Sequence, residues 1–209
     1  MQNALKAVLF DADGVIQHPA VDYPSAFAEL VKLNGDNIDR LIGEIFTAEQ
    51  PALTGRGDFA EELVKVLSSW GLIDRLDDVL KIWTSIQTDA AMFALIGSLR
   101  SLGFRCCLAT NQQAHRGRYM SETLCYRDMF DFQFYSYRLG AAKPATEYFR
   151  AVIKQLDLGP SEVLFIDDHE PNVAAARGVG INASLFTAKP PSSAAALRAI
   201  LLQHGIQLP

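Results

Sequence analysis

Residues 6–15 read Lys-Ala-Val-Leu-Phe-Asp-Ala-Asp-Gly-Val, a short apolar run that stops at two acids two positions apart. The run from Ala7 to Phe10 is continuous and bounded by charge, which is typical of a strand buried on both faces of a parallel sheet. Gly14 indicates that the chain turns there. Asp11 and Asp13 are therefore expected at the carboxyl end of a buried strand, where open α/β sheets place their ligands. The plainer alternative is an Asp-rich turn after a core strand.

Length and composition indicate a globular protein with one large domain, or one domain with a substantial insertion. The chain has 209 residues, of which 49% are hydrophobic and 21% charged, so a sizeable core is expected. The formal net charge is -5 and the chain has no basic block, which argues against nucleic acid as the main partner. An anionic small substrate stays compatible with this charge, because a local metal ion or lysine can override the global sign.

The cysteines and the lack of a long apolar run predict a cytoplasmic location. Cys106 and Cys107 lie in an apolar run, and Cys125 completes an odd count with no metal-ligand spacing. This pattern favours a reducing compartment. We expect no signal peptide, because Lys6 is followed closely by Asp11. No apolar run approaches the roughly 18 residues needed to span a bilayer, so no membrane partner is expected, and no sequence feature demands an oligomer.

Hydrophobic periodicity divides the chain into a first strand, a helical segment and a series of helix–strand units. Between 15 and 88 the pattern is purely helical, with helices predicted at about 24–33, 38–49, 58–70 and 76–86. From 89 on, helices alternate with apolar strands, which are predicted at 104–109, 132–135, 163–166 and 181–186. This order predicts an α/β fold, a doubly wound parallel sheet with an inserted helical cap domain. The α/β core would comprise 1–15 and 89–209, and the cap 16–88.

Polar side chains follow four separate strand ends, which meet at one edge in a parallel sheet. Carboxylates with open water positions suit Mg²⁺. A lysine amine and a threonine hydroxyl suit phosphate oxygens, and an aspartate can act as a nucleophile. The sequence therefore predicts a metal site with a phosphate site beside it. The residues concerned are Asp11, Asp13, Thr110, Asn111, Lys143, Asp167 and Asp168.

These residues form four motifs that resemble those of the haloacid dehalogenase-like (HAD) hydrolase superfamily. One Asp-x-Asp motif is a weak signal, whereas four motifs in order at compatible spacing are a strong one. The resemblance covers essentially the whole chain, and the helical insertion resembles the small helical cap of that family. It implies a Rossmann-like core of the HAD type. The motifs are Leu9-Phe10-Asp11-Ala12-Asp13-Gly14, Leu108-Ala109-Thr110-Asn111, Lys143-Pro144 and Phe165-Ile166-Asp167-Asp168.

The resemblance implies a phosphatase that works through an aspartyl-phosphate. Asp11 would attack phosphorus, and Asp13 would protonate the leaving oxygen and then deprotonate the water that hydrolyses the intermediate. The phosphoryl oxygens would be held by Thr110, Asn111 and Lys143.

The cofactor implied by the resemblance is Mg²⁺, which neutralises charge and positions the substrate in phosphoryl transfer. Asp11 and the backbone carbonyl of Asp13 would bind the ion. Of the final pair of acids, Asp168 resembles the direct ligand. Asp167 would be a further ligand, or would pair with Lys143 or a metal-bound water.

The acid at position 13 favours a phosphatase over a dehalogenase. Dehalogenases of this superfamily usually carry Tyr at this position and need no Mg²⁺, whereas a leaving alkoxide requires an acid. The half of the chain from Thr110 to Asp168 resembles the sugar-1-phosphate phosphatases, so the expected partner is a small-molecule phosphate ester such as a sugar phosphate. Two alternatives stay open, a phosphomutase of the β-phosphoglucomutase type and a catalytically silent binding relative.

Specificity is expected from the cap and from the loops that face it. Arg56 lies between two glycines of a cap loop and could bind an anionic or hydroxyl-rich leaving group; the alternative is a solvated arginine. Gln112, His115 and Arg116 follow the second motif and could reach the substrate. The alternative for these three is a polar helix face.

Overall fold

The computed structural model describes residues 4–32 and 35–208, which contain a five-stranded parallel sheet in the order β5-β4-β1-β6-β7. Because β4 and β5 lie on one side of β1 and β6 and β7 on the other, the strand order reverses between β1 and β6. Open sheets bind their ligands in the crevice at such a switch point. This confirms the predicted α/β fold. The strands are β1 (Ala7–Phe10), β4 (Arg105–Thr110), β5 (Phe132–Tyr135), β6 (Val163–Asp167) and β7 (Asn182–Leu185).

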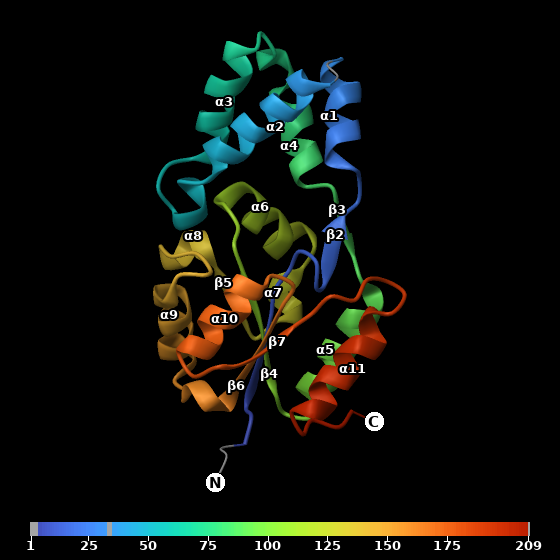
Figure 1. Ribbon diagram of the computed structural model, residues 1–209, viewed down its shortest axis with the longest axis vertical. Helices are drawn as coiled ribbons and strands as arrows, with labels where there is room; N and C mark the ends of the chain where they lie inside the picture. Colours follow the sequence, from blue (N-terminus) through green and yellow to red (C-terminus); the bar gives the residue numbers. More distant parts are fainter. Residues whose placement is uncertain (1–3, 33–34, 209) are drawn as a thin grey trace.

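Helices cover both faces of this sheet (Figure 1). Val8 and Phe10 point to one face and Ala7 and Leu9 to the other, since strand side chains alternate. All four are fully buried, which explains why the strand has a continuous apolar sequence. The first face is covered by α5 (Ala90–Ser101), α7 (Tyr126–Met129) and α11 (Ser193–Gln203), and the second by α9 (Thr146–Leu156) and α10 (Glu170–Gly178).

Short helical elements follow the strands on the side of the predicted site. The segment after β4 forms α6 (Ala114–Arg118) and continues as a π-helical turn, η3 (Tyr119–Thr123). The segment after β5 forms α8 (Ser136–Leu139). At the opposite edge of the sheet, a 3-10 turn, η4 (Pro160–Glu162), leads into β6.

The predicted helices between 15 and 88 form a separate unit at one end of the molecule (Figure 1). They bury their own hydrophobic cluster, in which Trp83 is only 3% exposed. Asp22 and Asp58 cap two of the helices, because each side chain accepts a backbone hydrogen bond from the first turn. The elements are α1 (Tyr23–Val31), α2 (Asp36–Glu49), η1 (Ala52–Thr54), α3 (Phe59–Ser69), η2 (Ile73–Arg75) and α4 (Leu76–Trp83). We refer to them together as the cap helices.

The prediction that 15–88 is purely helical is wrong at both ends. β2 (Gln17–Pro19) and β3 (Ile86–Thr88) pair as an antiparallel two-stranded sheet. A three-residue strand is too short for alternation to be recognised, and its partner lies far away in the sequence. The two chain crossings between the sheet and the cap helices therefore run side by side (Figure 1). We propose that the inserted unit extends over 16–88.

The burial of β4 predicts a selective thiol reaction. Cys106 and Cys107 are fully buried on opposite faces of the sheet, and burial raises the pKa of the Cys106 thiol to about 12 and that of Cys107 further still. Cys125 is exposed. Because the thiolate is the reacting species, iodoacetamide at neutral pH should modify Cys125 alone in the folded protein. Denaturant should then expose the other two. Peptide mass spectrometry checks this, and rapid labelling of Cys106 without denaturant would contradict it.

Candidate active site

Lys143 lies buried between two carboxylates at the ends of neighbouring strands. Its Nζ is 2.9 Å from Asp11 Oδ1, at the end of β1, and 2.6 Å from Asp167 Oδ2, at the end of β6. Burial acts to lower the pKa of Lys143, but the two carboxylates more than offset this and raise it. The lysine is therefore an ammonium ion, and the structure brings together three side chains that the sequence predicts at one sheet edge.

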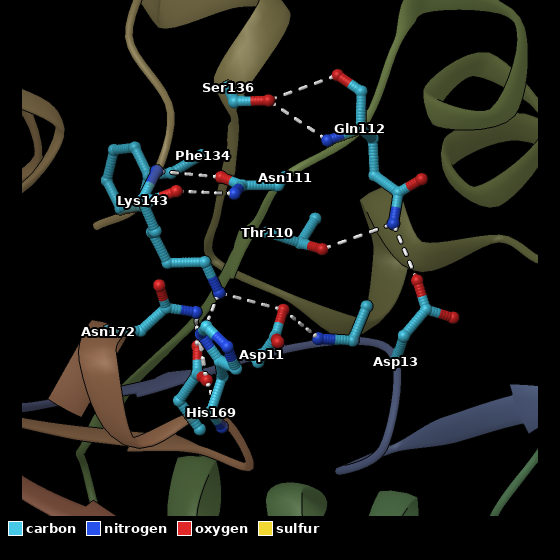
Figure 2. Close-up of polar contacts among 12 residues, drawn as sticks. Asp11, Asp13, Thr110, Asn111, Gln112, Phe134, Ser136, Lys143, His169 and Asn172 are labelled. Carbon is cyan, nitrogen blue, oxygen red and sulfur yellow. Dashed lines mark hydrogen bonds and ion pairs between the residues drawn. The ribbon is translucent and has the colours of Figure 1, made fainter. Parts of the chain in front are cut away.

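Asn111 fixes the position of Lys143. Its Nδ2 donates to the Lys143 carbonyl oxygen at 2.8 Å, and its Oδ1 accepts from the Lys143 backbone N–H at 2.8 Å (Figure 2). This pair of hydrogen bonds ties the loop after α8 to the end of β4. The amide of Asn111 therefore holds the backbone of Lys143 in position, next to the side chains that the sequence predicts to bind phosphate.

The two acids after β6 differ sharply in their surroundings. Asp167 is fully buried, and its oxygens accept from the His169 backbone N–H at 2.8 Å and from Asn172 Nδ2 at 3.1 Å, besides Lys143. Asp168 is exposed and lines the same cavity as Asp11. The surroundings of Asp167 match the interpretation of this residue as the partner of Lys143. They leave Asp168 as the freer carboxylate for a metal ion.

The carboxylates at this edge fit a divalent cation. Asp11, Asp167 and Asp168 each offer an oxygen, and these three atoms lie within 4.8 Å of one another. Burial, with a further contribution from Asp167, raises the pKa of Asp11 to about 7, although Lys143 acts to lower it. A cation beside Asp11 would keep this carboxylate ionised at neutral pH. An all-oxygen donor set of this kind suits Mg²⁺.

Gly14 allows the loop after β1 to approach the second acid of the fourth motif. Its φ is +80°, and a Cβ at this position would lie 1.9 Å from Asp168 Oδ2. A side chain here would therefore collide with the carboxylate and would also strain the backbone. The glycine of the first motif therefore leaves room for the Asp168 carboxylate beside this loop.

Asp13 is held by an arginine from α6. Arg116 Nη1 lies 2.5 Å from Asp13 Oδ2, and Nη2 lies 2.8 Å from Oδ1. Gln17 and Gln112 each donate one further hydrogen bond, at 2.9 and 2.8 Å. Burial acts to raise the pKa of Asp13, but Arg116 and the two amides outweigh it and lower the pKa. The carboxylate form of Asp13 is therefore favoured in this arrangement.

Arg116 also connects Asp13 to the cap helices. Its Nε donates to the Trp83 carbonyl oxygen at 2.9 Å, at the end of α4, and its Nη1 donates to Gln112 Oε1 at 2.9 Å. The residue is 6% exposed. The sequence interpretation has Arg116 reaching the substrate. The structure places it at the wall of a cavity, with its donors directed at protein acceptors.

The remaining predicted residues lie at different distances from the site. Thr110 is buried at the end of β4, lines the cavity of Asp11 and accepts from Gln112 Nε2 at 3.3 Å (Figure 2). Arg56 lines a neighbouring cavity of about 530 Å³ with Lys143. His115 lines none of the three cavities around the site, and its half-buried ring lies toward the cap helices.

Two cavities meet at Asp13. The first, of about 450 Å³, is lined by most of the residues that are predicted to bind phosphate and the metal ion. The second, of about 260 Å³, lies between Asp13 and the cap helices. Asp13, Pro19 and Asn111 line both. We call them the polar cavity and the cap cavity.

Sequence reasoning missed Asn172 and Lys189, which line the polar cavity together with His18. Lys189 follows β7, so the same search for polar groups after strand ends would have found it. Asn172 lies in the first turn of α10, a few residues beyond the fourth motif. His18 lies in β2, whose pairing with β3 no local pattern indicated.

A family model described as haloacid dehalogenase-like hydrolase matches residues 5–180. The chain therefore belongs to the haloacid dehalogenase-like hydrolase family. Its relatives include phosphatases. None of the helices among the described residues is long and apolar enough to cross a membrane.

Curated relatives differ in the substrates that their names give. The chain is 34% identical over 96 residues to a sesquiterpene phosphatase of Aspergillus oryzae, covering 46% of this chain and 49% of the relative. It is 26% identical to bifunctional epoxide hydrolase 2 of Sus scrofa, covering 98% of this chain and 40% of the relative. It thus spans half or less of these two proteins. A D-ribitol-5-phosphate phosphatase of Bacteroides thetaiotaomicron is 25% identical, covering 84% of this chain and 89% of the relative.

Solved structures share the fold. A HAD family enzyme from Bacteroides thetaiotaomicron superposes with a TM-score of 0.76 at 21% identity, covering 91% of this chain and 98% of that one. The wild-type form of that enzyme in complex with magnesium and inorganic phosphate gives 0.73 at 23% identity, covering 87% and 94%. L-2-haloacid dehalogenase from Xanthobacter autotrophicus gives 0.63 at 19%, covering 94% and 82%.

The close approach at Gly14 predicts a specific effect of a methyl group. Gly14→Ala should weaken Mg²⁺ binding at least about tenfold, because the new Cβ displaces the Asp168 carboxylate. Gly103→Ala is the matched control, since Gly103 has a φ of +89° and open space around its Cβ position. Both variants should lose about 1–3 kcal/mol of stability from backbone strain. Calorimetric titration with Mg²⁺ checks the difference; equal affinities in both variants would show that Gly14 has no such role.

Proposed function

We propose that this protein is a Mg²⁺-dependent phosphomonoester hydrolase, which acts on a small phosphate ester through an aspartyl-phosphate on Asp11. The observation that carries the proposal is the position of Asp13 at the junction of two cavities. On one side lie Asp11, Lys143 and Thr110, which suit a phosphoryl group, and on the other lies space for a leaving group. The phosphatases among the relatives support the same reaction.

In the first step, an oxygen of Asp11 attacks phosphorus and the bond from phosphorus to the ester oxygen breaks. Asp13 gives its proton to the departing oxygen, so that an alcohol leaves. This step needs the acid form of Asp13, whereas Arg116 favours the base form. The negative charge of a phosphate ester beside Asp13 would raise its pKa and so favour the protonated form.

In the second step, water attacks the phosphorus of the aspartyl-phosphate and Asp13 takes a proton from that water. The phosphorus–Asp11 bond breaks, and inorganic phosphate and the free carboxylate result. The ion pair with Arg116 helps here, since it favours Asp13 as a carboxylate. In both steps, Lys143 and Thr110 would hold the phosphoryl oxygens, with Asn111 beside them.

Mg²⁺ would be held by Asp11, the backbone carbonyl of Asp13 and Asp168, with Asp167 holding Lys143 in place. When bound, it supplies positive charge that neutralises and orients the phosphoryl oxygens. The proposed substrates are small-molecule phosphate esters. The resemblance to sugar-1-phosphate phosphatases favours a sugar phosphate among them. A terpenoid phosphate is the rival class, because the sesquiterpene phosphatase is also a relative.

The role of Asp11 predicts the effect of removing its nucleophilic charge. Asp11→Asn should lower phosphate release from every substrate by more than about 10³-fold, because an amide is a poor nucleophile. Asp74→Asn, at an exposed position of the cap helices, should leave the rate unchanged. Phosphate release over a panel of sugar phosphates, nucleotides and alkyl phosphates checks this. Undiminished turnover in Asp11→Asn would refute the aspartyl-phosphate mechanism, and an isomerised product in place of phosphate would indicate a mutase.

The division of labour between the two acids after β6 predicts different metal responses. Chelation with EDTA should abolish phosphate release, and added Mg²⁺ should restore it. Asp168→Asn should raise the Mg²⁺ concentration for half-maximal activity at least about tenfold. Asp167→Asn should mainly destabilise the fold, because it leaves Lys143 with one carboxylate fewer. Mg²⁺ titration of activity, together with thermal unfolding, separates the two effects; the reverse assignment of effects would show that Asp167 is the direct ligand.

A further inference from the structure

The cap cavity has mainly apolar walls. Tyr23 stacks on Trp83 with ring centroids 5.6 Å apart and an interplanar angle of 6°, and Phe46 lies 5.1 Å from the same ring. Leu53 and Pro19 complete this part of the lining. At about 260 Å³ the cavity is small, so it suits a compact group.

The polar side chains of the cap cavity are already engaged with protein atoms. Asp13 accepts from Arg116, Gln17 and Gln112. The amide oxygen of Gln112 accepts from Arg116, and its Nε2 donates to Asp13 and Thr110. The amide of Asn111 makes its two hydrogen bonds with the backbone of Lys143. These walls therefore offer a ligand little further hydrogen bonding.

Glu49 is the charged side chain of these walls that keeps unused acceptor capacity. Its Oε1 accepts from Trp83 Nε1 at 2.7 Å, which leaves part of the acceptor capacity of a carboxylate unused. The residue is 8% exposed and lines the cap cavity. One hydroxyl or amine of a ligand could be satisfied here, but not the several hydroxyls of a polyol.

The exposure of Phe46 also favours an apolar ligand. It is 41% exposed, although its ring belongs to the aromatic group around Trp83 and lines the cap cavity. An apolar ligand in the cavity would cover part of this ring and gain the free energy of removing apolar surface from water. A polyol would instead lose its hydration, because the walls return few hydrogen bonds.

We propose that the leaving group of the substrate is a compact apolar alcohol, carrying at most one further hydrogen-bond donor, rather than a sugar or an open-chain polyol. This inference rests on the proposed phosphatase function and specifies its substrate class. The phosphoryl group would occupy the polar cavity, and the apolar part would pack against Tyr23, Phe46 and Trp83 where they line the cap cavity.

The test compares two esters of primary alcohols, so that the leaving groups have similar basicity. Cyclohexylmethyl phosphate is the apolar ester and D-ribitol 5-phosphate the polyol ester, and phosphate release is followed with Mg²⁺ present. We expect kcat/KM to be at least about tenfold higher for cyclohexylmethyl phosphate. Equal values, or a preference for the polyol ester, would overturn the inference.

Two cap variants with equal exposure sharpen the comparison. Phe46→Ala should lower the ratio of the two kcat/KM values several-fold, because it removes an apolar wall of the cap cavity. Ile73→Ala is the control, since Ile73 is also 41% exposed but lies outside the cavity lining. It should leave both values unchanged. An unchanged ratio in Phe46→Ala would count against the cavity as the leaving-group site.

Binding measurements separate failure of this inference from failure of the proposed function. Acetyl phosphate serves as a small activated substrate; if no ester and no acetyl phosphate is hydrolysed, the phosphatase proposal fails. The cavity is still tested by calorimetric titration with cyclohexylmethylphosphonate and with a polyhydroxylated alkylphosphonate of similar size. Tighter binding of the cyclohexyl compound supports the apolar cavity, and equal or weaker binding refutes it.

Discussion

The site depends on the buried ammonium of Lys143 between Asp11 and Asp167. Removing one partner from a buried ion pair typically costs about 3–5 kcal/mol, because an uncompensated charge is left behind. Here the three charges come from the end of β1, the end of β6 and the loop after α8. The strand order places the two carboxylates side by side, and the ammonium carried by that loop offsets their repulsion. Fold and charge balance are therefore linked at the point where the strand order of the sheet reverses.

Much of this arrangement could be predicted because it is encoded locally. Each acid directly follows a short apolar run, and parallel strands bring such ends to one edge. The sequence thus placed Asp11 and Asp167 at this edge without any knowledge of their partners, whereas Lys143 comes from the loop after α8. The ion pair between Asp13 and Arg116 could not be found in this way, since Arg116 lies inside α6 rather than at a strand end, and no pattern points to a partner 103 residues away. The pairing of β2 with β3 was missed for the same reason, as a contact between distant segments with no periodic pattern.

Arg116 shows that the position of a residue along the chain does not reveal the contacts of its side chain. Its position after the second motif predicts proximity to the substrate, and the structure does place it at a cavity wall. Its guanidinium, however, joins the carbonyl of Trp83 to the carboxylate of Asp13. A planar group with donors on both sides suits such a bridge. Any movement of α4 that displaces this carbonyl would therefore also disturb the hydrogen bonds that hold Asp13.

The contrast between the two cavities explains why motifs identify the reaction more readily than the substrate. In the proposed reaction the polar cavity would hold the phosphoryl group, which is common to all phosphate esters, and most of its residues follow core strands. The cap cavity would meet the part of the substrate that varies, and its apolar lining comes from 16–88, where the sequence shows no motif. The resemblance of the second half of the chain to sugar-phosphate enzymes therefore concerns phosphorus chemistry. The leaving group is better judged from side chains such as Phe46 and Glu49, whose burial and hydrogen bonding only the folded chain determines.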